Sequence, residues 1–466
     1  MAYMRRIFLI VAILASLLLD PACGPERAPD HPPFGYCMVH WTQTIYIDQR
    51  IDVLFVIDNA ESMTGKQAQL EGSIKYFVEE LEDLFGSQYH IAVITTGMES
   101  DACPDKTGEG GRFQDRLGHI AWSGSEPIFD FTRDQSCRVV AGDNLKCLYD
   151  EAEERGTALV GVSGCPYRRG LAAMRRALGA DLLGSYNTGF LRADVPLVVI
   201  LISDGEDCGE PGEVSEGIPG LDERICSYAA KGAGPAGGTY YPGDPERRQY
   251  RLTPVAEYFD FLMDLKDNKQ GMVRFAAIVG VKDTEDLSST SIDYAGSEPD
   301  AAVLLACSIA DCPYGNCEAL PGTRAIRLAQ MFGIGTFGFV DTICREDFSN
   351  TIEELAPFVS CPRIFMLSEP MLDPDLATIM FDEEPLPEYS CGIPGQIVPC
   401  DGPGDLSCPA SDCVKTWTYS PPGSPPDSDA PGGMIGFAAH VDPCDFTWKQ
   451  PIQRRIDLIY VTPCGI

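Results

Sequence analysis

The sequence predicts an α/β fold: a doubly wound, mostly parallel sheet with helices on both faces, followed by a small disulfide-rich β module. Two patterns predict this architecture. Short apolar runs alternate along the chain with segments whose apolar residues recur every three or four positions, which is typical of parallel strands and their covering helices. From residue 361 onward the helical periodicity ends, and residues 361–466 contain seven cysteines among short β-like runs and a Pro-rich loop.

Five apolar runs are the predicted strands of the sheet. In chain order they are Asp52 to Ile57, His90 to Thr95, Val195 to Ser203, Met272 to Val281 and Gly335 to Val340. Helical stripes of apolar residues lie between and after these runs; they begin at Leu70, Leu171, Val255, Ala325 and Phe348. The pair Thr253-Pro254 marks one helix start, since a capping residue followed by proline is typical of a first turn.

The first residues predict export. Arg5 and Arg6 precede an apolar run from Ile7 to Leu19, which is shorter than the roughly 20 residues that span a bilayer and is typical of a signal peptide. Small residues then precede Cys23, an arrangement that resembles the cleavage box of bacterial lipoproteins. Cys23 is therefore predicted to carry lipid and to anchor the protein to the membrane. Ordinary signal-peptide cleavage near Ala22 is the alternative interpretation.

The predicted boundaries divide the chain into four parts. They are a signal peptide (1–22), a tether and linker (23–47), the sheet domain (48–360) and the Cys-rich β module (361–466). Within the sheet domain, residues 97–163 and 208–250 are long insertions where loops at the carboxyl edge of the sheet belong. Loops of this length are usually functional, and ligands of open α/β sheets bind at that edge.

The number of cysteines and the net charge limit the classes of function to be considered. The chain has nineteen cysteines, and exported proteins use so many as disulfides. Three expected pairs would each close a loop within or beside one insertion: Cys103–Cys137, Cys147–Cys165 and Cys208–Cys226. The net charge of −34 repels phosphate backbones, so nucleic acid is not an expected partner.

The most informative motif follows the first predicted strand. The run Ile51-Asp-Val-Leu-Phe-Val-Ile-Asp-Asn-Ala-Glu-Ser-Met63 ends its apolar part at Asp58, and Ser62 follows in a short polar loop. A later strand ends in Leu201-Ile-Ser-Asp-Gly205, which delivers Asp204 to the same edge of a parallel sheet. The two segments together predict carboxylate and hydroxyl oxygens at the carboxyl edge.

These segments resemble the metal-ion-dependent adhesion site of von Willebrand factor A (vWA) domains, and the resemblance covers roughly residues 50–360. In that family an Asp-x-Ser-x-Ser loop, a Thr and a second Asp hold a divalent cation. An acidic side chain of a protein partner completes the coordination. The resemblance implies that Asp58, Ser62 and Asp204 hold Mg²⁺ or Mn²⁺, which prefer oxygen ligands.

The chain departs from the family pattern at two positions. Ala60 replaces the first serine of the loop, and Cys165 stands at the threonine position. Neither side chain offers the oxygen ligand that Mg²⁺ prefers. Two interpretations stay open: a degenerate site that binds metal weakly, with water in place of the missing ligands, or a metal-free relic.

A closer resemblance concerns location. Gly164-Cys165, Ser203-Asp-Gly-Glu-Asp-Cys208 and Ile343-Cys-Arg-Glu-Asp-Phe-Ser349 resemble segments of Cys-rich vWA lipoproteins from myxobacteria-like Gram-negative bacteria. The leading hypothesis is an exported, membrane-anchored protein that faces the periplasm or the cell surface and mediates protein–protein binding or adhesion. The alternative is a structural envelope lipoprotein with a metal-free vWA fold. We do not expect an enzyme, because the sequence lacks a nucleophile-elbow pattern and a phosphate-binding loop.

Overall fold

The computed structural model describes about two thirds of the predicted sheet domain and parts of the flanking segments. The described ranges are 36–47, 50–67, 89–98, 110–114, 160–209, 224–232, 252–269, 271–296, 302–309, 317–360 and 452–463, with short stretches within 69–77, 239–250 and 364–437. The predicted signal peptide, the lipidation site Cys23 and three predicted disulfide cysteines, Cys103, Cys137 and Cys147, lie outside the described residues.

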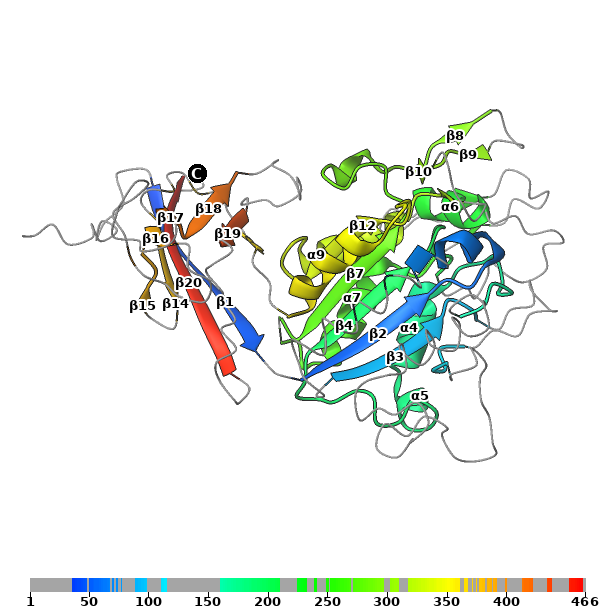
Figure 1. Cartoon of the computed structure of the whole chain (residues 1–466), viewed down its shortest axis with the longest axis horizontal. Helices are drawn as coiled ribbons and strands as arrows, with labels where there is room; N and C mark the ends of the chain where they lie inside the picture. Colours follow the sequence, from blue (N-terminus) through cyan, green and yellow to red (C-terminus); the bar gives the residue numbers. More distant parts are fainter. Residues whose placement is uncertain are drawn as a thin grey trace, which may run out of the picture.

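Five parallel strands form the main sheet (Figure 1). They are β2 (Ile51–Ile57), β3 (Tyr89–Thr95), β4 (Leu197–Ile202), β7 (Val273–Val279) and β12 (Gly338–Thr342). The order across the sheet is β12-β7-β4-β2-β3, with every neighbouring pair parallel. Every residue of β2, β4 and β7 is buried, as expected for strands covered on both faces. The predicted α/β fold class is therefore confirmed.

The strand order reverses beside β2. The chain passes from β2 to β3 on one side and then returns to β4 on the other side. In doubly wound sheets, ligands bind beyond the carboxyl ends of the strands at such a switch point. Asp58 directly follows β2, and Asp204 lies two residues beyond the end of β4, so the two aspartates flank the switch point.

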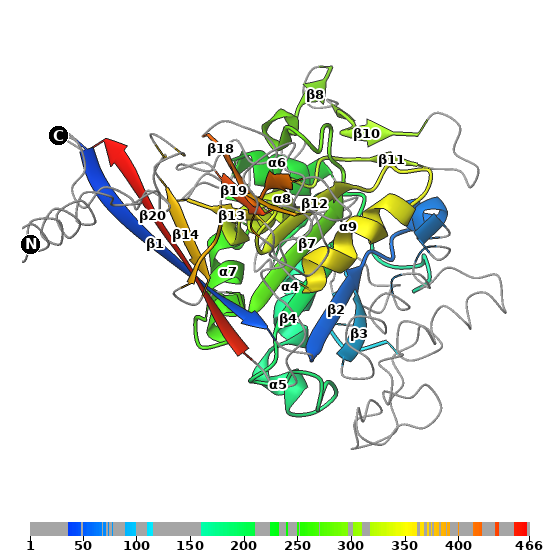
Figure 2. The same cartoon turned by 60° about the vertical axis from the view of Figure 1, so that its left-hand side comes forward.

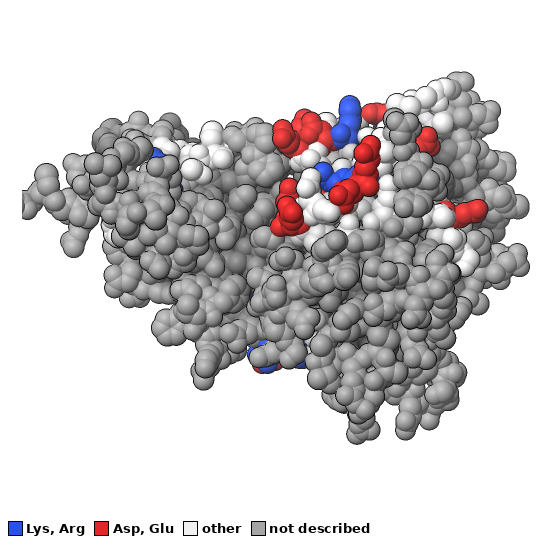
Figure 3. Space-filling view, viewed as in Figure 1, with Lys and Arg blue, Asp and Glu red and all other residues white. Residues whose placement is uncertain are grey.

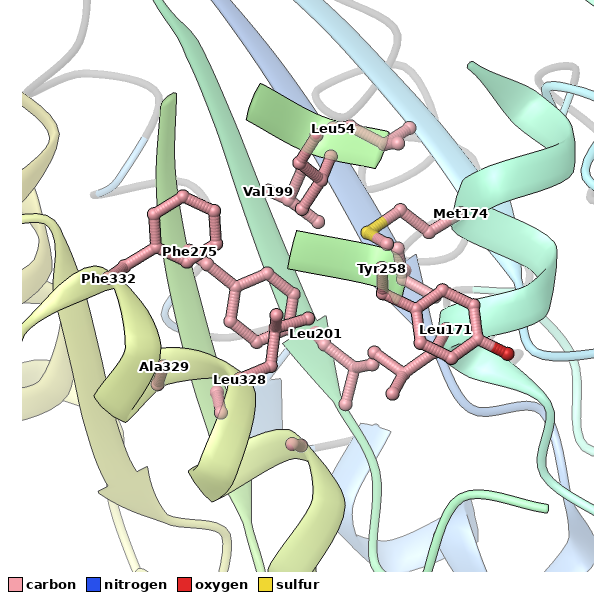
Figure 4. Close-up of a cluster of buried hydrophobic side chains, with 14 of the residues drawn as sticks. Leu54, Leu171, Met174, Val199, Leu201, Tyr258, Phe275, Leu328, Ala329 and Phe332 are labelled. Carbon is pink, nitrogen blue, oxygen red and sulfur yellow. The ribbon is translucent and has the colours of Figure 1, made fainter. Parts of the chain in front are cut away.

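Three helices cover one face of the sheet: α4 (Gly170–Ala177), α7 (Val255–Asp264) and α8 (Thr323–Phe332). Figure 4 shows strand side chains, Leu54 and Phe275 among them, pointing at side chains from all three helices. All of the apolar side chains that are labelled there are at most 7% exposed. This cluster fixes the helices that carry the loops at the carboxyl edge.

The other face is covered by α9 (Ser349–Ser360) and by helical residues between 64 and 77. There the rings of Phe55 and Phe77 meet edge to face, with centroids 5.5 Å apart. Successive residues of a strand point to opposite faces, so Leu54 joins one core cluster and Phe55 the other. This explains why β2 is an uninterrupted apolar run in the sequence.

One predicted helix is divided in two. The apolar stripe from Leu171 to Leu182 predicts a single helix, but α4 ends at Ala177 and α5 (Ala180–Leu183) begins separately. Gly179 between them is extended, with φ −76° and ψ 152°. Glycine is a poor helix former, and here it ends the first helix although the apolar spacing continues.

The C-terminal β module contains the start of the described chain as well as its end. β1 (Tyr36–Ile47) pairs antiparallel with β20 (Ile452–Pro463), and β14 (Thr378–Phe381) and β15 (Glu384–Pro385) extend this sheet. The three longest of these strands lie side by side in both views (Figures 1 and 2). The sequence predicts that residues 36–47 belong to the tether and linker (23–47). Their backbone pairing places them in the β module instead.

Shorter elements complete the described fold. The module also contains β13 (Ile364–Met366), β16 (Tyr389–Cys391), β17 (Cys413–Lys415), β18 (Trp417–Ser420) and β19 (Met434–Phe437). The excursions of the main domain contain α6 (Arg224–Gly232), β5 (Thr239–Tyr240), β6 (Gln249–Tyr250), β8 (Tyr294–Ala295), β9 (Ala302–Val303), β10 (Cys307–Ser308) and β11 (Glu318–Ala319). No helix among the described residues is long and apolar enough to cross a membrane.

Candidate functional site

The structure brings the three predicted ligand residues together at the carboxyl edge. The short helix η1 (Glu61–Met63) follows β2 and directs Ser62 toward the loop after β4. The Ser62 hydroxyl donates a hydrogen bond to Oδ1 of Asp204 at 3.0 Å. Asp58 and Asp204 are 0% and 2% exposed, so both carboxylates are withdrawn from water.

The guanidinium of Arg168 joins these three residues. Its Nε donates to Oδ2 of Asp58 at 2.9 Å, and its Nη2 lies 2.7 Å from both Oδ1 of Asp204 and the Ser62 hydroxyl. Nη1 donates to the Pro166 carbonyl at 3.2 Å. The Arg168 side chain is only 6% exposed, so one buried cation bridges two strands of the sheet.

Lys66 adds a second buried cation. Its ammonium lies 2.8 Å from Oδ2 of Asp204 and 3.2 Å from the Ser62 carbonyl. Lys66 follows Ser62 by four residues on a helical segment, a spacing that places both on one side of the helix. Arg168 and Lys66 together carry two positive charges, which balance the two aspartates when both are ionised.

The remaining acceptor positions of Asp58 are also occupied. Its Oδ1 accepts from the Ala60 backbone N–H at 2.9 Å and from the Thr96 hydroxyl at 3.3 Å, and its Oδ2 accepts from the Ser203 hydroxyl at 2.8 Å. Burial raises the pKa of Asp58, and the Arg168 guanidinium offsets part of that rise. For Asp204, burial also opposes ionisation, but Arg168 and Lys66 outweigh it and lower the pKa.

In this arrangement the site does not fit a divalent cation. Mg²⁺ needs oxygen ligands at about 2.0–2.1 Å in near-octahedral geometry. Here Arg168 and Lys66 nitrogens contact both oxygens of Asp204, and Arg168 also contacts Asp58 and Ser62. Ala60 contributes only a backbone N–H to this network. Cys165 is 5% exposed and disulfide-bonded, so its sulfur is not available as a ligand.

The loop after β4 is fixed by its other carboxylates. Glu206 accepts the backbone N–H groups of Thr323 and Arg324 at 2.9 and 3.1 Å, so it caps the start of α8. Asp207 accepts the Leu171 N–H at 3.0 Å at the start of α4 and contacts Nε of Arg324 at 3.2 Å. Carboxylates stabilise helix N-termini. Burial raises the pKa of Glu206 to about 7, against the opposing hydrogen bonds from Thr323 and the charge of Arg324.

Little space remains inside this edge. A cavity of ≈ 10 Å³ lies between Arg168, Gly205 and the start of α8, which is room for about one water molecule. The described part of the switch point is therefore filled by protein atoms. A ligand would have to contact the loops above it.

Two disulfides fasten those loops. The expected pair Cys208–Cys226 is present and ties the loop after β4 to α6. Cys307–Cys344 ties β10 to the end of β12. Sequence spacing alone did not suggest the second pair, because Cys344 lies beyond a helix and a strand. The expected pairs Cys103–Cys137 and Cys147–Cys165 involve cysteines outside the described residues and stay predictions.

Arg168 and Lys66 belong to the site although the adhesion motif does not include them. The signals were present: Lys66 follows Ser62 at helical spacing, and Arg168 follows Cys165 by three residues. Gly205 was a third signal. A Cβ atom at Gly205 would lie 2.6 Å from three atoms of the Arg168 side chain, so glycine leaves the space that the guanidinium fills.

No family model matches the sequence, and no curated protein is significantly similar to it. Proximal thread matrix protein 1 from the mussel byssus is 9% identical, with a TM-score of 0.30, over 70% of this chain and 51% of that chain. The pilus adhesin SpaC from Lactobacillus rhamnosus GG is 11% identical, with a TM-score of 0.34, over 92% and 42%. The pilus adhesin RrgA from Streptococcus pneumoniae is 11% identical, with a TM-score of 0.28, over 92% and 59%. This chain spans about half the length of these structures, and TM-scores this low identify neither a family nor a function.

Proposed function

We propose that this chain is an exported vWA-type protein that binds another protein through the loops at the carboxyl edge of its sheet. The observation that supports this proposal is that disulfides and helix-capping carboxylates hold these loops in place. The loop after β4 is held by Cys208–Cys226 and by carboxylates that cap α4 and α8, and the excursion after β7 is held by Cys307–Cys344. Loops positioned on a rigid scaffold are where binding residues concentrate.

The chemistry of the excursion after β7 favours a protein partner. Leu304 and Leu305 are each 45% exposed, which makes them the only large apolar side chains of the described main domain that reach solvent to this extent. The exposed charged residues that the structure describes in the same excursion are mostly acidic: they are Asp283, Glu285, Asp286, Asp293 and Glu318, against Lys282. On the side of the molecule that Figure 3 shows, the described surface of the main domain is mainly acidic, with few basic side chains. The complementary partner is an apolar protein surface rimmed by Lys and Arg.

The proposed binding does not use a divalent cation at Asp58, Ser62 and Asp204. Arg168 and Lys66 hold the oxygens that a cation would need. The membrane anchor at Cys23 remains part of the proposal, on the strength of the sequence before it. We assign no catalytic role to the chain.

Partner capture from a cell-envelope extract tests this function. The mature protein is immobilised and exposed to the extract in Mg²⁺ and again in EDTA. We expect the same partner under both conditions, and we expect Leu304→Ser/Leu305→Ser to lose it. Met38→Ser is the matched control, because Met38 is 46% exposed but lies in β1 of the other module.

Two results would contradict the proposal. A partner that is lost in EDTA would return the function to a metal-dependent adhesion mechanism. A partner that the double leucine variant retains would place the binding surface elsewhere.

A structural envelope lipoprotein is the second candidate. The filled switch point favours it, since only ≈ 10 Å³ of cavity remains beside Arg168. It predicts that no partner is captured specifically, and that Cys23→Ser releases the protein from the membrane fraction. The first candidate shares the second expectation, so capture of a specific partner separates the two.

A further inference from the structure

We propose that Arg168 and Lys66 are a built-in replacement for a divalent cation, and that removing Arg168 uncovers a latent Mn²⁺ or Mg²⁺ site on Asp58, Ser62 and Asp204. The inference does not depend on the partner-binding function proposed above. It concerns what holds the carboxyl edge together and what this edge can bind once that group is removed.

Arg168 lies where a bound cation would have to lie. Arg168 touches one oxygen from each of the three residues, at 2.9 Å for Asp58 and 2.7 Å for both Asp204 and Ser62. The three oxygens therefore lie around one cationic group, and Arg168 fills the space between the ends of β2 and β4 that a cation would have to occupy to contact them.

Arg168 and Lys66 also supply the charge that a divalent cation would supply. Two buried carboxylates near each other repel, and burial without a counter-charge is costly. A divalent cation would supply two positive charges at this place, and Arg168 with Lys66 supplies the same number. The aspartate pair is thus neutralised from within the chain.

The departures from the adhesion motif occur together in this chain. Ala60 lacks a side-chain oxygen and uses its backbone N–H to bind Asp58. Cys165 is committed to a disulfide, and Arg168 stands three residues after it. Gly205 leaves room for the guanidinium, because a Cβ atom would lie 2.6 Å from it. The chain lacks two ligand side chains and has an internal cation that makes them unnecessary.

The latent site follows from these arguments. In Arg168→Ala, two buried carboxylates and a hydroxyl would face a space without the guanidinium, with Lys66 still on the far oxygen of Asp204. A cation that binds the folded form alone stabilises it by mass action. The variant should therefore be less stable than the wild type without metal and should regain stability with it.

The test is Mn²⁺ titration of the full mature chain, followed by electron paramagnetic resonance of free Mn²⁺ and by thermal unfolding. In the wild type we expect no Mn²⁺ to bind at Asp58, so Asp58→Asn should leave any Mn²⁺ binding unchanged. Arg168→Ala is expected to gain one site, at least about tenfold tighter than any wild-type binding, which corresponds to about 1.4 kcal/mol. Its melting temperature should rise on addition of Mn²⁺, and adding Asp58→Asn to Arg168→Ala should abolish both effects.

Arg192→Ala is the matched control for general charge. It removes the same charge from another buried aspartate, Asp52, which lacks a second carboxylate partner among the described contacts. This variant should gain no Mn²⁺ site. If it gains one equal to that of Arg168→Ala, the effect reflects the acidity of the whole chain and the proposal fails.

Two further outcomes overturn the proposal. One is a single Mn²⁺ site in the wild type that Asp58→Asn removes, since the cation would then already bind beside Arg168. The other is a folded Arg168→Ala that gains no binding. If Arg168→Ala does not fold without metal, Arg168→Gln takes its place. Failure of Mn²⁺ to restore the folded form of either variant also counts against the latent site.

Discussion

Each edge of the main sheet buries an aspartate against an arginine, Asp52 within β2 and Asp58 directly after it, but the geometry of the two pairs differs. At the amino edge, Asp52 accepts from Nε and from the backbone N–H of Arg192, each at 2.8 Å. Lys266 lies nearby and donates to the carbonyls of Arg192 and Val195 at 2.6 Å. At the carboxyl edge, Arg168 instead bridges two carboxylates from different strands.

The difference is one of connectivity and exposure. The Arg192 side chain is 23% exposed and fixes one short loop to the start of β2. The Arg168 side chain is 6% exposed and joins the ends of β2 and β4 at the switch point. A buried Asp–Arg pair is therefore not by itself a mark of a binding site. Two converging carboxylates at the place where the strand order reverses are the more specific feature.

The largest expected effect separates the two edges by stability. Asp58→Ala should lower the free energy of unfolding by about 3–5 kcal/mol, because it removes one of the two buried carboxylates that balance the charges of Arg168 and Lys66. Asp52→Ala should cost less, about 1–3 kcal/mol, since water reaches the partly exposed Arg192. Urea unfolding of both variants measures the difference. Equal costs would mean that exposure of the arginine does not distinguish the edges.

A second prediction concerns pH and the amino edge. Burial raises the pKa of Asp52 to about 6, against the opposing charge and hydrogen bonds of Arg192. The stability that protonated Asp52 contributes is fully present below about pH 4 and is lost as the pH rises through about 6. Relative to the wild type, Asp52→Asn should therefore become more stable by about 2–3 kcal/mol between pH 4 and pH 7.

His90 acts in the opposite direction at the same edge. Its Nδ1 lies 3.5 Å from Asp52 and 2.9 Å from the Phe190 carbonyl, and burial lowers its pKa to about 4. The stability contributed by neutral His90 is present above about pH 6.5 and is lost as the pH falls through about 4. Unfolding curves at several pH values should show a steeper rise of stability with pH in Asp52→Asn than in the wild type. Parallel curves would refute the assignment to Asp52.

The smallest expected effect comes from the rim of the amino edge. Arg50 and Asp194 form an ion pair at 2.9 Å, with side chains 27% and 73% exposed. Exposed pairs contribute little, so Arg50→Ala should change the free energy of unfolding by less than about 1 kcal/mol. The same urea assay measures it. A loss as large as that of Asp52→Ala would show that the rim takes part in the buried network.

Local sequence pattern predicted the sheet well, because β2, β4 and β7 are buried on both faces and are therefore continuous apolar runs. It also located Asp58 and Asp204, since both directly follow such runs. It could not predict the end of α4, where Gly179 interrupts an apolar stripe that would otherwise continue. The low helix propensity of glycine, rather than the periodicity of the apolar residues, determines where α4 ends.

The content of the site was less predictable than its position. The identity of the group between Asp58 and Asp204 depends on a long side chain from a third loop, and its reach is set by backbone geometry. Arg168 is an ordinary residue in the sequence until the fold places it against Gly205. The motif shows which oxygen ligands are missing, but it contains no position for the nitrogen atoms of Arg168 and Lys66 that take their place.

The pairing of β1 with β20 also determines when the molecule can be completed. Tyr36 pairs with Pro463 and Ile47 with Ile452. During synthesis, β1 is therefore made early but can pair only after β20 has been made. Contacts between distant parts of a chain form slowly, because the loop between them must first be closed. Until then β1 is an open strand edge, which invites pairing with other chains. The main sheet lies wholly between the two strands and can close first, so docking of the last strand finishes folding and removes this hazard.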